Sequence, residues 1–394
     1  MSYVYRSGQR TGARRGPARA HAARRKQSIE TINPARFVKP ARAVQAEVYV
    51  PLHSFETFGL QQLLLRNIQA RGFTAPSPIQ DQAIPYGLAG QDVIGVANTG
   101  TGKTVAFALP ILQHLLQNPA AQALVLAPTR ELAAQIEDEC RLLAKGSGLY
   151  GVLLIGGTSM GTQLRRLQDR PQLVIGTPGR VKDHLTRGTL DLSGFTACVL
   201  DEVDRMLDMG FVNDIRWILG RLPDARQSLF FTATLNASVT AIIREFAREP
   251  VTISVSNGDT TENVAQDIVR YSGTAEQLER LHDLLLGAPK ALVFDETQRK
   301  VERLGKELAA RGFAVDAIHG GKTQGQRQRA LTRFRAGEVT VLVATDVAAR
   351  GLDIRDVTHV INFSTPHSYD DYIHRIGRAG RAGNQGYAFT FVQS

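Results

Sequence analysis

Residues 97–104 combine the residue types that hold phosphate groups, in the order Ala-Asn-Thr-Gly-Thr-Gly-Lys-Thr. The apolar run Val93–Ala97 leads into this loop and a helical pattern, Val105–Leu116, follows it, which is the setting of a phosphate-binding loop. Glycines let backbone N–H groups close around phosphate oxygens, and the following helix adds its positive end. We expect the loop to bind a nucleotide through Ala97, Asn98, Thr99, Gly100, Thr101, Gly102, Lys103 and Thr104.

Within this loop, Lys103 would place a positive charge on the β and γ phosphates, and Thr104 would offer a hydroxyl to Mg²⁺. Two adjacent carboxylates, Asp201 and Glu202, follow a second apolar run, Ala197–Leu200. Asp201 would hold Mg²⁺, and Glu202 would orient and deprotonate an attacking water. A solvated acidic turn is the alternative interpretation, and the upstream loop argues against it. The two segments predict hydrolysis of a nucleoside triphosphate.

Both segments need strands that end at one edge of a sheet. From about residue 50 the sequence alternates short apolar runs with longer helical patterns, which is typical of buried parallel strands. A polar stretch at 256–263 interrupts the pattern, which then restarts. We predict two α/β lobes with parallel sheets, at 49–255 and 264–394, joined by a linker at 256–263. The expected strands are Val93–Ala97, Ala123–Ala127, Gly151–Ile155, Leu173–Ile175, Cys198–Leu200, Ser228–Phe231, Val251–Val255, Ile268–Tyr271, Ala291–Phe294, Ala314–Ile318, Val339–Val343, His359–Phe363 and Tyr387–Val392.

The composition suits a globular protein of two lobes, with 43% hydrophobic and 21% charged residues among 394. The two cysteines, Cys140 and Cys198, follow no paired spacing, so they indicate neither a disulfide framework nor a metal knuckle. This cysteine usage favours a reducing cytoplasm. No apolar run approaches the ~20 residues that span a bilayer, so we expect no membrane partner.

The net charge of +10 is concentrated near the N-terminus. Residues 1–48 hold eleven Arg and Lys against two acidic residues, a net charge of +9. This tail is rich in Ala, Gly and Arg and lacks apolar periodicity, so we expect it to be disordered when free. We favour a sequence-independent anchor for nucleic-acid phosphates over a solubilising arm or an organellar transit peptide.

The quartet Asp-Glu-Val-Asp at 201–204 resembles the signature of the DEAD-box helicases, with Val203 where that family usually has alanine. The motifs between Phe55 and Arg381 follow the order of the family. The resemblance implies two tandem RecA-like lobes, ATP and Mg²⁺ as cofactors, and RNA as the nucleic-acid partner.

Residues 72–80 resemble the Q motif of the family, and Phe55 precedes Gly72 by 17 residues, as the family pattern requires. The resemblance implies an adenine site. The amide of Gln80 offers a donor and an acceptor to the base edge, and Phe55 or Phe73 offers an aromatic face.

Further segments supply hydroxyls, guanidinium groups and exposed backbone amides, which suit a phosphate and sugar backbone rather than base edges. Each one alone would be read as a turn or a helix cap. The resemblance implies RNA contacts by Thr129, Arg130, Gly157, Thr177 and Arg180 in the first lobe, and by His319, Gly320 and Thr345 in the second. Gly321 stands where the family often has an acid.

The second lobe also supplies candidates for the ATP site. Arg378 and Arg381 lie three residues apart, so on a helical turn they face one point, where they could neutralise γ-phosphate charge as arginine fingers do. The alternative is a helix with surface salt bridges. The resemblance implies that Arg350 helps place the attacking water and that Asp353 holds a ribose hydroxyl. Thr232, Thr234 and His374 are the expected coupling residues.

The sequence therefore predicts an RNA-dependent ATPase that binds single-stranded RNA and unwinds short duplexes. An ATP-gated RNA clamp with little unwinding would use the same residues, and a DNA translocase is a third hypothesis. Because neither lobe shows an obvious dimer element, we expect a monomer. Target choice is left to the tail or to protein partners.

Overall fold

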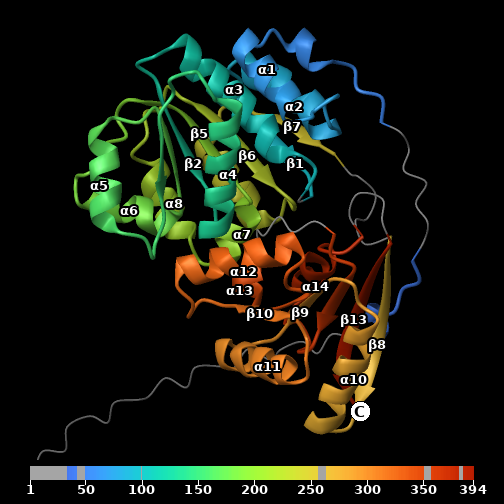
Figure 1. Cartoon of the computed structure of the whole chain (residues 1–394). Helices are drawn as coiled ribbons and strands as arrows, with labels where there is room; N and C mark the ends of the chain where they lie inside the picture. Colours follow the sequence, from blue (N-terminus) through green and yellow to red (C-terminus); the bar gives the residue numbers. More distant parts are fainter. Residues whose placement is uncertain (1–32, 42–48, 99, 256–262, 350–355, 381–384) are drawn as a thin grey trace, which may run out of the picture.

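A computed structural model describes residues 33–41, 49–98, 100–255, 263–349, 356–380 and 385–394. The elements between residues 49 and 255 form the upper lobe in Figure 1, and those from residue 263 onward form the lower lobe. Within the described ranges, no helix has the length and apolar character needed to cross a membrane.

The first lobe contains a seven-stranded parallel sheet in the order β3-β4-β2-β5-β6-β1-β7. Its strands are β1 (Val93–Val96), β2 (Gln122–Leu126), β3 (Gly151–Leu154), β4 (Leu173–Gly176), β5 (Phe195–Asp201), β6 (Gln227–Thr232) and β7 (Val251–Ser254). Its helices are η2 (Phe55–Phe58), α1 (Gln62–Ala70), α2 (Pro78–Leu88), α3 (Lys103–Gln117), α4 (Arg130–Leu143), α5 (Met160–Gln168), α6 (Pro178–Thr186), α7 (Val203–Asp208), α8 (Val212–Leu219) and α9 (Ala237–Phe246).

The second lobe contains a six-stranded parallel sheet in the order β10-β11-β9-β12-β13-β8. Its strands are β8 (Val264–Tyr271), β9 (Ala291–Phe294), β10 (Val315–Ile318), β11 (Val341–Ala344), β12 (His359–Asn362) and β13 (Gly386–Gln393). Its helices are α10 (Thr274–Leu286), α11 (Gln298–Ala310), α12 (Gln324–Ala336), α13 (Asp346–Ala349) and α14 (Tyr369–Ile376).

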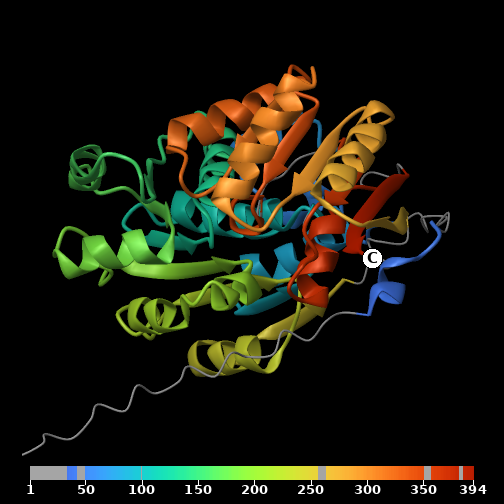
Figure 2. The same cartoon turned by 90° about the horizontal axis from the view of Figure 1, so that it is seen from below.

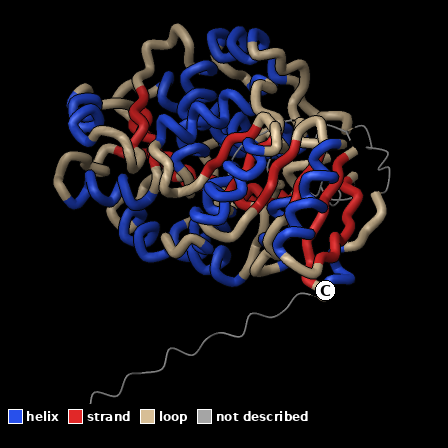
Figure 3. Tube along the Cα trace, turned by 60° about the horizontal axis from the view of Figure 1, so that its bottom comes forward, coloured by secondary structure: helices blue, strands red, loops and turns tan. Residues whose placement is uncertain are grey.

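Most strands are apolar on both faces because helices pack on both faces of each sheet (Figure 3). The edge strands β7 and β8 are partly exposed. In β2, Ala123 and Val125 belong to one hydrophobic cluster, whereas Leu124 and Leu126 belong to the other. This alternation is the two-residue period of a strand between two helical layers. Every expected run overlaps a strand, and the prediction of two α/β lobes with parallel sheets is confirmed.

Part of the N-terminal tail is ordered, which corrects the expectation of disorder over residues 1–48. Residues Pro34–Phe37 form the short helix η1, and Phe37 is fully buried in the core of the second lobe. Lys39 forms an isolated antiparallel bridge with Gln266 of β8. The burial of one aromatic ring and the pairing with a strand hold this stretch in place. The parts of the tail at 1–32 and 42–48 lie outside the described residues.

Candidate ATP and nucleic-acid site

The loop between β1 and α3 has the backbone of a phosphate-binding loop. Gly100 and Gly102 have φ angles of +89° and +93°, which glycine adopts without a steric penalty. Lys103 begins α3, is only 6% exposed, and its Nζ donates to the carbonyl of Ala97 at 2.9 Å. The ammonium therefore points back into the loop, where phosphate oxygens are expected. Thr101 donates to the carbonyl of Asn98 at 2.8 Å, Thr104 follows in α3, and Thr99 lies outside the described residues.

Gln80 of the Q-motif helix α2 holds the phosphate-binding loop directly. Its Nε2 donates to the carbonyl of Gly102 at 3.1 Å, and the hydroxyl of Ser77 donates to the carbonyl of Thr101 at 2.7 Å. A Cβ atom on Gly102 would lie 2.4 Å from that Nε2, so the contact requires glycine. The adenine-side element and the phosphate loop are therefore one packed unit.

The two aromatic rings assigned to the base have different positions. Phe55 is 3% exposed and belongs to the first-lobe core, where its ring meets Phe58 and Phe73 edge to face at 6.0 and 6.2 Å. Core side chains surround Phe55, so its ring is less accessible than that of Phe73. Phe73 is only partly buried, and it remains the candidate for base contact.

The acidic pair follows β5 at a strained turn. Glu202 has φ +54°, a left-handed conformation that non-glycine residues seldom adopt outside functional sites. Its backbone N–H donates to Oδ1 of Asp201 at 3.0 Å, and its carboxylate pairs with Arg205 at 2.5 Å. Both partners of this ion pair have side chains that are 7% exposed. The turn separates the two carboxylates although they are neighbours in sequence.

Burial raises the pKa of Asp201 to about 7, although the Lys103 ammonium opposes the shift. Burial also disfavours the charged form of Glu202, but Arg205, Lys103 and Arg378 together hold the pKa of that carboxyl below its usual range. Two adjacent acids with pKa values shifted in opposite directions are typical of catalytic pairs. Glu202 stays ionised, as a general base must.

The donor set fits a divalent cation. Asp201 is buried and raised in pKa, so a bound cation would stabilise its charged form. Mg²⁺ commonly uses one or two protein oxygens together with waters and substrate phosphates. Asp201 and the hydroxyl of Thr104 are the oxygens available for that role.

Asp204 joins the acidic turn to the end of β6. Its Oδ2 accepts from the backbone N–H groups of Ala233 and Thr234 at 3.1 and 2.9 Å and from the Thr234 hydroxyl at 3.1 Å. The Thr232 hydroxyl donates to the carbonyl of Thr234 at 2.9 Å. Thr232 and Thr234 are thus tied to the turn that carries Glu202, which is the placement a coupling segment requires.

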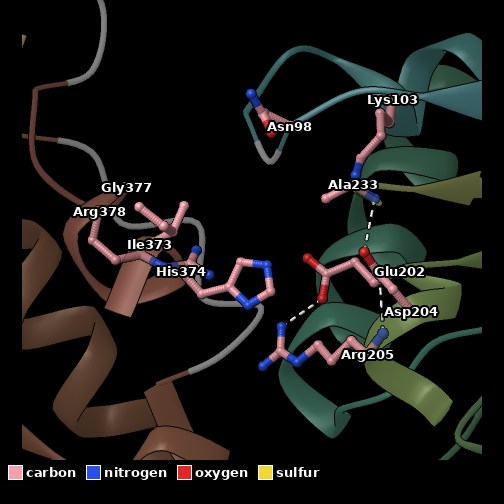
Figure 4. A pocket seen from close by; sticks show the side chains of 10 residues that line it. All are labelled: Asn98, Lys103, Glu202, Asp204, Arg205, Ala233, Ile373, His374, Gly377 and Arg378. Carbon is pink, nitrogen blue, oxygen red and sulfur yellow. Dashed lines mark hydrogen bonds and ion pairs between the residues drawn. The ribbon is translucent and has the colours of Figure 1, made fainter. Parts of the chain in front are cut away.

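The second lobe closes this site. Figure 4 shows a pocket whose first-lobe wall faces the end of α14 in the second lobe. Arg378 is 5% exposed, and its charge lowers the pKa of Glu202 across the interface. The lining residues are Asn98, Lys103, Glu202, Asp204, Arg205 and Ala233 from the first lobe and Ile373, His374, Gly377 and Arg378 from the second. Arg350, Asp353 and Arg381 lie outside the described residues.

The order of the strands separates two groups of site residues in the first lobe. The nucleotide candidates follow β1, β5 and β6, which are adjacent in the sheet, whereas the RNA candidates follow β3, β4 and β2, which are adjacent on the other side. In the second lobe, His319 and Thr345 follow β10 and β11, which are also neighbours. One edge of each sheet therefore offers a continuous row of RNA candidates.

The first-lobe RNA candidates lie against one another. The guanidinium of Arg130 sits over Gly157, where an added Cβ would be 2.2 Å from Nη1. Arg180 Nη1 donates to the carbonyl of Thr158 at 3.4 Å. Thr129 and Thr177 are the N-cap residues of α4 and α6, so two helix N-termini open onto this row. Such a surface suits backbone phosphates.

In the second lobe, both ring nitrogens of His319 form hydrogen bonds. Its Nδ1 accepts from the backbone N–H of Gly321 at 3.2 Å, so its Nε2 carries the proton and donates to Glu302 at 3.1 Å. Gly320 lies beside the amide of Gln298. The backbone N–H of Thr345 donates to the carbonyl of Ile318 at 3.3 Å, which places this threonine next to the His319 loop.

An ion pair crosses between the lobes next to the RNA candidates. Arg327 of α12 contacts Glu131 of α4 at 2.7 Å, and the two side chains are 8% and 2% exposed. Glu131 directly follows Arg130, so the first turn of α4 serves the RNA row and the lobe interface together. This buried pair therefore contributes to the contact between the lobes.

Comparison with known proteins gives the family. The DEAD/DEAH box helicase profile matches residues 77–243, and the helicase conserved C-terminal domain matches residues 276–383. The ATP-dependent RNA helicase CshA of Listeria monocytogenes is 43% identical over 342 residues, which cover 86% of this chain and 66% of the relative. The chain belongs to the DEAD-box helicase family.

Other relatives of this DEAD-box helicase agree. CshA of Bacillus subtilis, a DEAD-box ATP-dependent RNA helicase, is also 43% identical, over 86% of this chain and 69% of the relative. S. cerevisiae Dbp5 bound to RNA and ADP BeF3 superposes with a TM-score of 0.76 at 31% identity, over 86% of this chain and 90% of that one. Mss116p bound to ssRNA and AMP-PNP gives 0.78 at 30% identity, over 86% and 74%.

Two departures of this DEAD-box helicase from the usual motifs have local explanations. Val203 is fully buried in the first-lobe core, so the larger side chain fills space beneath the acidic turn. A Cβ on Gly321 would lie 2.7 Å from Oε1 of Gln298, so the Gln298 amide occupies the space of the acid that the family often has there.

Sequence reasoning did not predict several of the contacts that hold this site. Arg205 could have been found from its spacing, because a residue three places after Glu202 shares its helix face. Glu131 and its partner Arg327 are 196 residues apart, so only the fold brings them together. The same holds for Arg375, which pairs with Asp346 at 2.5 Å and anchors α14.

Proposed function

We propose that this DEAD-box protein is an RNA-dependent ATPase that binds the backbone of single-stranded RNA and locally unwinds short duplexes. The observation that supports this proposal most directly is the pocket, which is lined by Lys103 and Glu202 of one lobe and by Arg378 of the other. Neither lobe alone holds this set, so hydrolysis requires closure. RNA candidates from both lobes line the same interface, which supports the dependence on RNA.

Each residue has a distinct task in the proposed reaction. Glu202, kept ionised by Arg205, takes the proton of the attacking water. Lys103 and Arg378 balance the charge that develops on the transferred phosphoryl group, with Arg378 acting as the arginine finger. Mg²⁺, held by Asp201 and Thr104, would neutralise phosphate charge when bound. Arg350, Arg381 and Asp353 keep the roles that the family resemblance implies.

RNA binding and ATP hydrolysis are coupled in this proposal because both ligands favour the closed arrangement of the two lobes. ATP and RNA each contact both lobes in this proposal, so each ligand stabilises the closed arrangement and raises affinity for the other. Asp204, Thr232 and Thr234 transmit the state of the acidic turn to the end of β6. Bending of one bound strand would then open a short duplex locally rather than by long tracking.

The proposal extends to cellular setting and assembly. The thiols of Cys140 and Cys198 are both free and buried, which supports a reducing cytoplasm. Because one chain supplies both halves of the pocket, a monomer is sufficient for activity.

Steady-state ATP hydrolysis with and without single-stranded RNA tests the proposal. We expect stimulation by RNA in the wild type and its loss in Glu202→Gln, because an amide cannot accept the water proton. Glu245→Gln is the matched control, since Glu245 sits in an exposed ion pair with Arg216 and should leave the rate unchanged. Equal rates with and without RNA would overturn the coupling.

The ATP-gated clamp is the alternative within the same residues. Strand displacement of a short labelled duplex, measured beside ATP-dependent binding of a single strand, separates the two. Binding without displacement would favour the clamp. DNA of equal length and sequence provides a further comparison, because contact with the 2′-hydroxyl gives RNA the advantage.

A further inference from the structure

The N-terminal segment 33–41 packs on the helix that leads to the proposed arginine finger. The ring of Phe37 lies 4.6 Å from the ring of Tyr372, and the guanidinium of Arg36 lies 3.8 Å from the centroid of Tyr369. Both tyrosines belong to α14. Lys39 and Gln266 exchange backbone hydrogen bonds of 2.9 and 2.8 Å, which fix the segment along β8.

The opposite side of α14 faces the ATP pocket. Tyr369 and Tyr372 are three residues apart and share one helix face, whereas His374 is two residues beyond Tyr372 and points to the other side. His374 and Arg378 line the pocket. The segment and the pocket therefore contact α14 on two different sides. Figure 2 shows η1 beside the second lobe.

Two further contacts show that α14 is a positioned element. Arg375 is fixed by Asp346 at 2.5 and 2.6 Å and by Asn362 at 3.1 Å, which anchors the helix at its pocket end. The Tyr372 hydroxyl donates to Oε1 of Gln266 at 2.9 Å, so the residue paired with Lys39 also holds α14. Displacement of the segment would remove the packing that sets the orientation of the tyrosine face.

We propose that Phe37 and Arg36 are positioning residues for ATP hydrolysis, because they buttress α14 and so hold Arg378 opposite Glu202. This inference rests on the proposed role of Arg378 as the finger. Neither residue touches the pocket, so both act through Tyr369 and Tyr372. The segment that sequence analysis assigns to a disordered tail thereby becomes part of the hydrolysis machinery.

The same stretch of chain continues to the nucleotide side of the first lobe. Asp81, 1% exposed and next to Gln80, accepts from the backbone N–H groups of Leu52 and His53 at 2.8 and 3.0 Å and from the Tyr49 hydroxyl at 2.5 Å. Seven residues separate Ala41 from Tyr49, and the eight Cα–Cα steps between them span at most about 29 Å. The helix that leads to the proposed arginine finger, α14, and the Q-motif helix, α2, are therefore connected by this short stretch of chain as well as by the linker that follows β7.

The test compares full-length Phe37→Ala, Phe37→Leu and Arg36→Ala with Val38→Ala. Val38 is 50% exposed in the same segment, so its truncation controls for general disturbance. We expect Phe37→Ala to lower the kcat of RNA-stimulated hydrolysis about tenfold or more, a fraction of the ~10³–10⁵ that an arginine finger supplies. The KM for ATP should change much less, Phe37→Leu should recover most of the rate, and Arg36→Ala should show a smaller loss.

A double-mutant cycle with Arg378→Ala, measured in single turnovers, decides whether the effect runs through the finger. If it does, Phe37→Ala and Arg36→Ala slow the wild type but cause no further loss in the Arg378→Ala background. The same loss in both backgrounds would overturn the proposal, and so would rates for Phe37→Ala and Arg36→Ala equal to that of Val38→Ala. Arg36→Ala removes an exposed guanidinium, so it keeps the test informative even if Phe37→Ala unfolds the lobe. A wild type without RNA stimulation would instead contradict the proposed function.

Discussion

At the scale of single residues, the chemistry depends on how differently two neighbouring carboxylates are surrounded. Asp201 is buried, and the Lys103 ammonium only partly offsets the effect of that burial, so its pKa is raised to about 7. Glu202, one residue later, turns into a left-handed conformation and meets Arg205, Lys103 and Arg378. The left-handed backbone at Glu202 is the structural means by which two neighbouring acids enter different surroundings.

Arg205 gives the first residue-scale prediction. Arg205→Ala leaves Glu202 charged and buried without its closest partner, which typically costs about 3–5 kcal/mol. Denaturant unfolding measures this loss. Arg216→Ala breaks a pair whose side chains are 45% and 43% exposed, and it should cost under ~1 kcal/mol. Equal losses of unfolding free energy in the two variants would show that the buried pair stabilises the protein no more than the exposed pair does.

Gly157 gives the second residue-scale prediction. A Cβ there would be 2.2 Å from Arg130 Nη1, so Gly157→Ala should displace the guanidinium and lower RNA affinity about tenfold or more, as loss of a charged contact does. Fluorescence anisotropy with labelled single-stranded RNA measures the change. Gly188 is the matched control, because it has φ +65° but nothing within 4 Å of an added Cβ. Gly188→Ala should carry the backbone strain alone and keep its RNA affinity.

At the scale of elements, the start of α4 combines two roles. Thr129 caps the helix, Arg130 lies over Gly157, and Glu131 reaches Arg327 of the second lobe. A single turn of helix therefore joins the RNA row to the lobe interface. A movement of the RNA row would therefore shift the lobe interface, and the reverse, because the three residues share one rigid turn of backbone.

The Glu131–Arg327 pair tests this connection. Glu131→Gln should reduce RNA affinity in the presence of a non-hydrolysable ATP analogue by about 30-fold, equal to ~2 kcal/mol. Affinity without nucleotide should change little, because the open lobes do not form the pair. The exchange Glu131→Arg with Arg327→Glu should recover part of the loss. Equal losses with and without nucleotide would show that the pair does not report closure.

The strands and the motifs at their ends could be predicted from sequence because short apolar runs and loop chemistry are local signals. The docking of Phe37 could not, because one aromatic residue among arginines and alanines gives no periodicity, and its partner Tyr372 lies more than 300 residues away. The burial of Phe55 could not be predicted either, because the surrounding core decides it and the motif position indicates only a role.

At the scale of the whole molecule, charge is divided between a nearly neutral pair of lobes and a strongly basic tail. Residues 1–48 carry +9 of the total +10. Long-range attraction of RNA would therefore depend on the tail, whereas the row of candidates at the lobe interface would set the bound geometry.

Salt dependence separates these contributions. Each phosphate contact with a single strand contributes about −0.7 to the slope of log K against log salt, so replacing Arg14, Arg15, Arg24 and Arg25 by Ala should flatten the slope by up to about 2.8. Replacement of the same four residues by Lys keeps the charge and should leave the slope unchanged. Identical slopes for the Ala and Lys variants would indicate a solubilising arm.

The position of Phe37 in the second-lobe core also sets an order of events during synthesis. The ribosome makes this residue 335 positions before Tyr372, the ring that it packs against, so at about 5–20 residues per second it waits about 17–67 s for its binding site. The first lobe can fold in that interval, while the ring of Phe37 stays exposed to solvent because its core does not yet exist. A fragment that starts at β8 would lack the ring altogether and would leave both a hole beside Tyr372 and a bare strand edge.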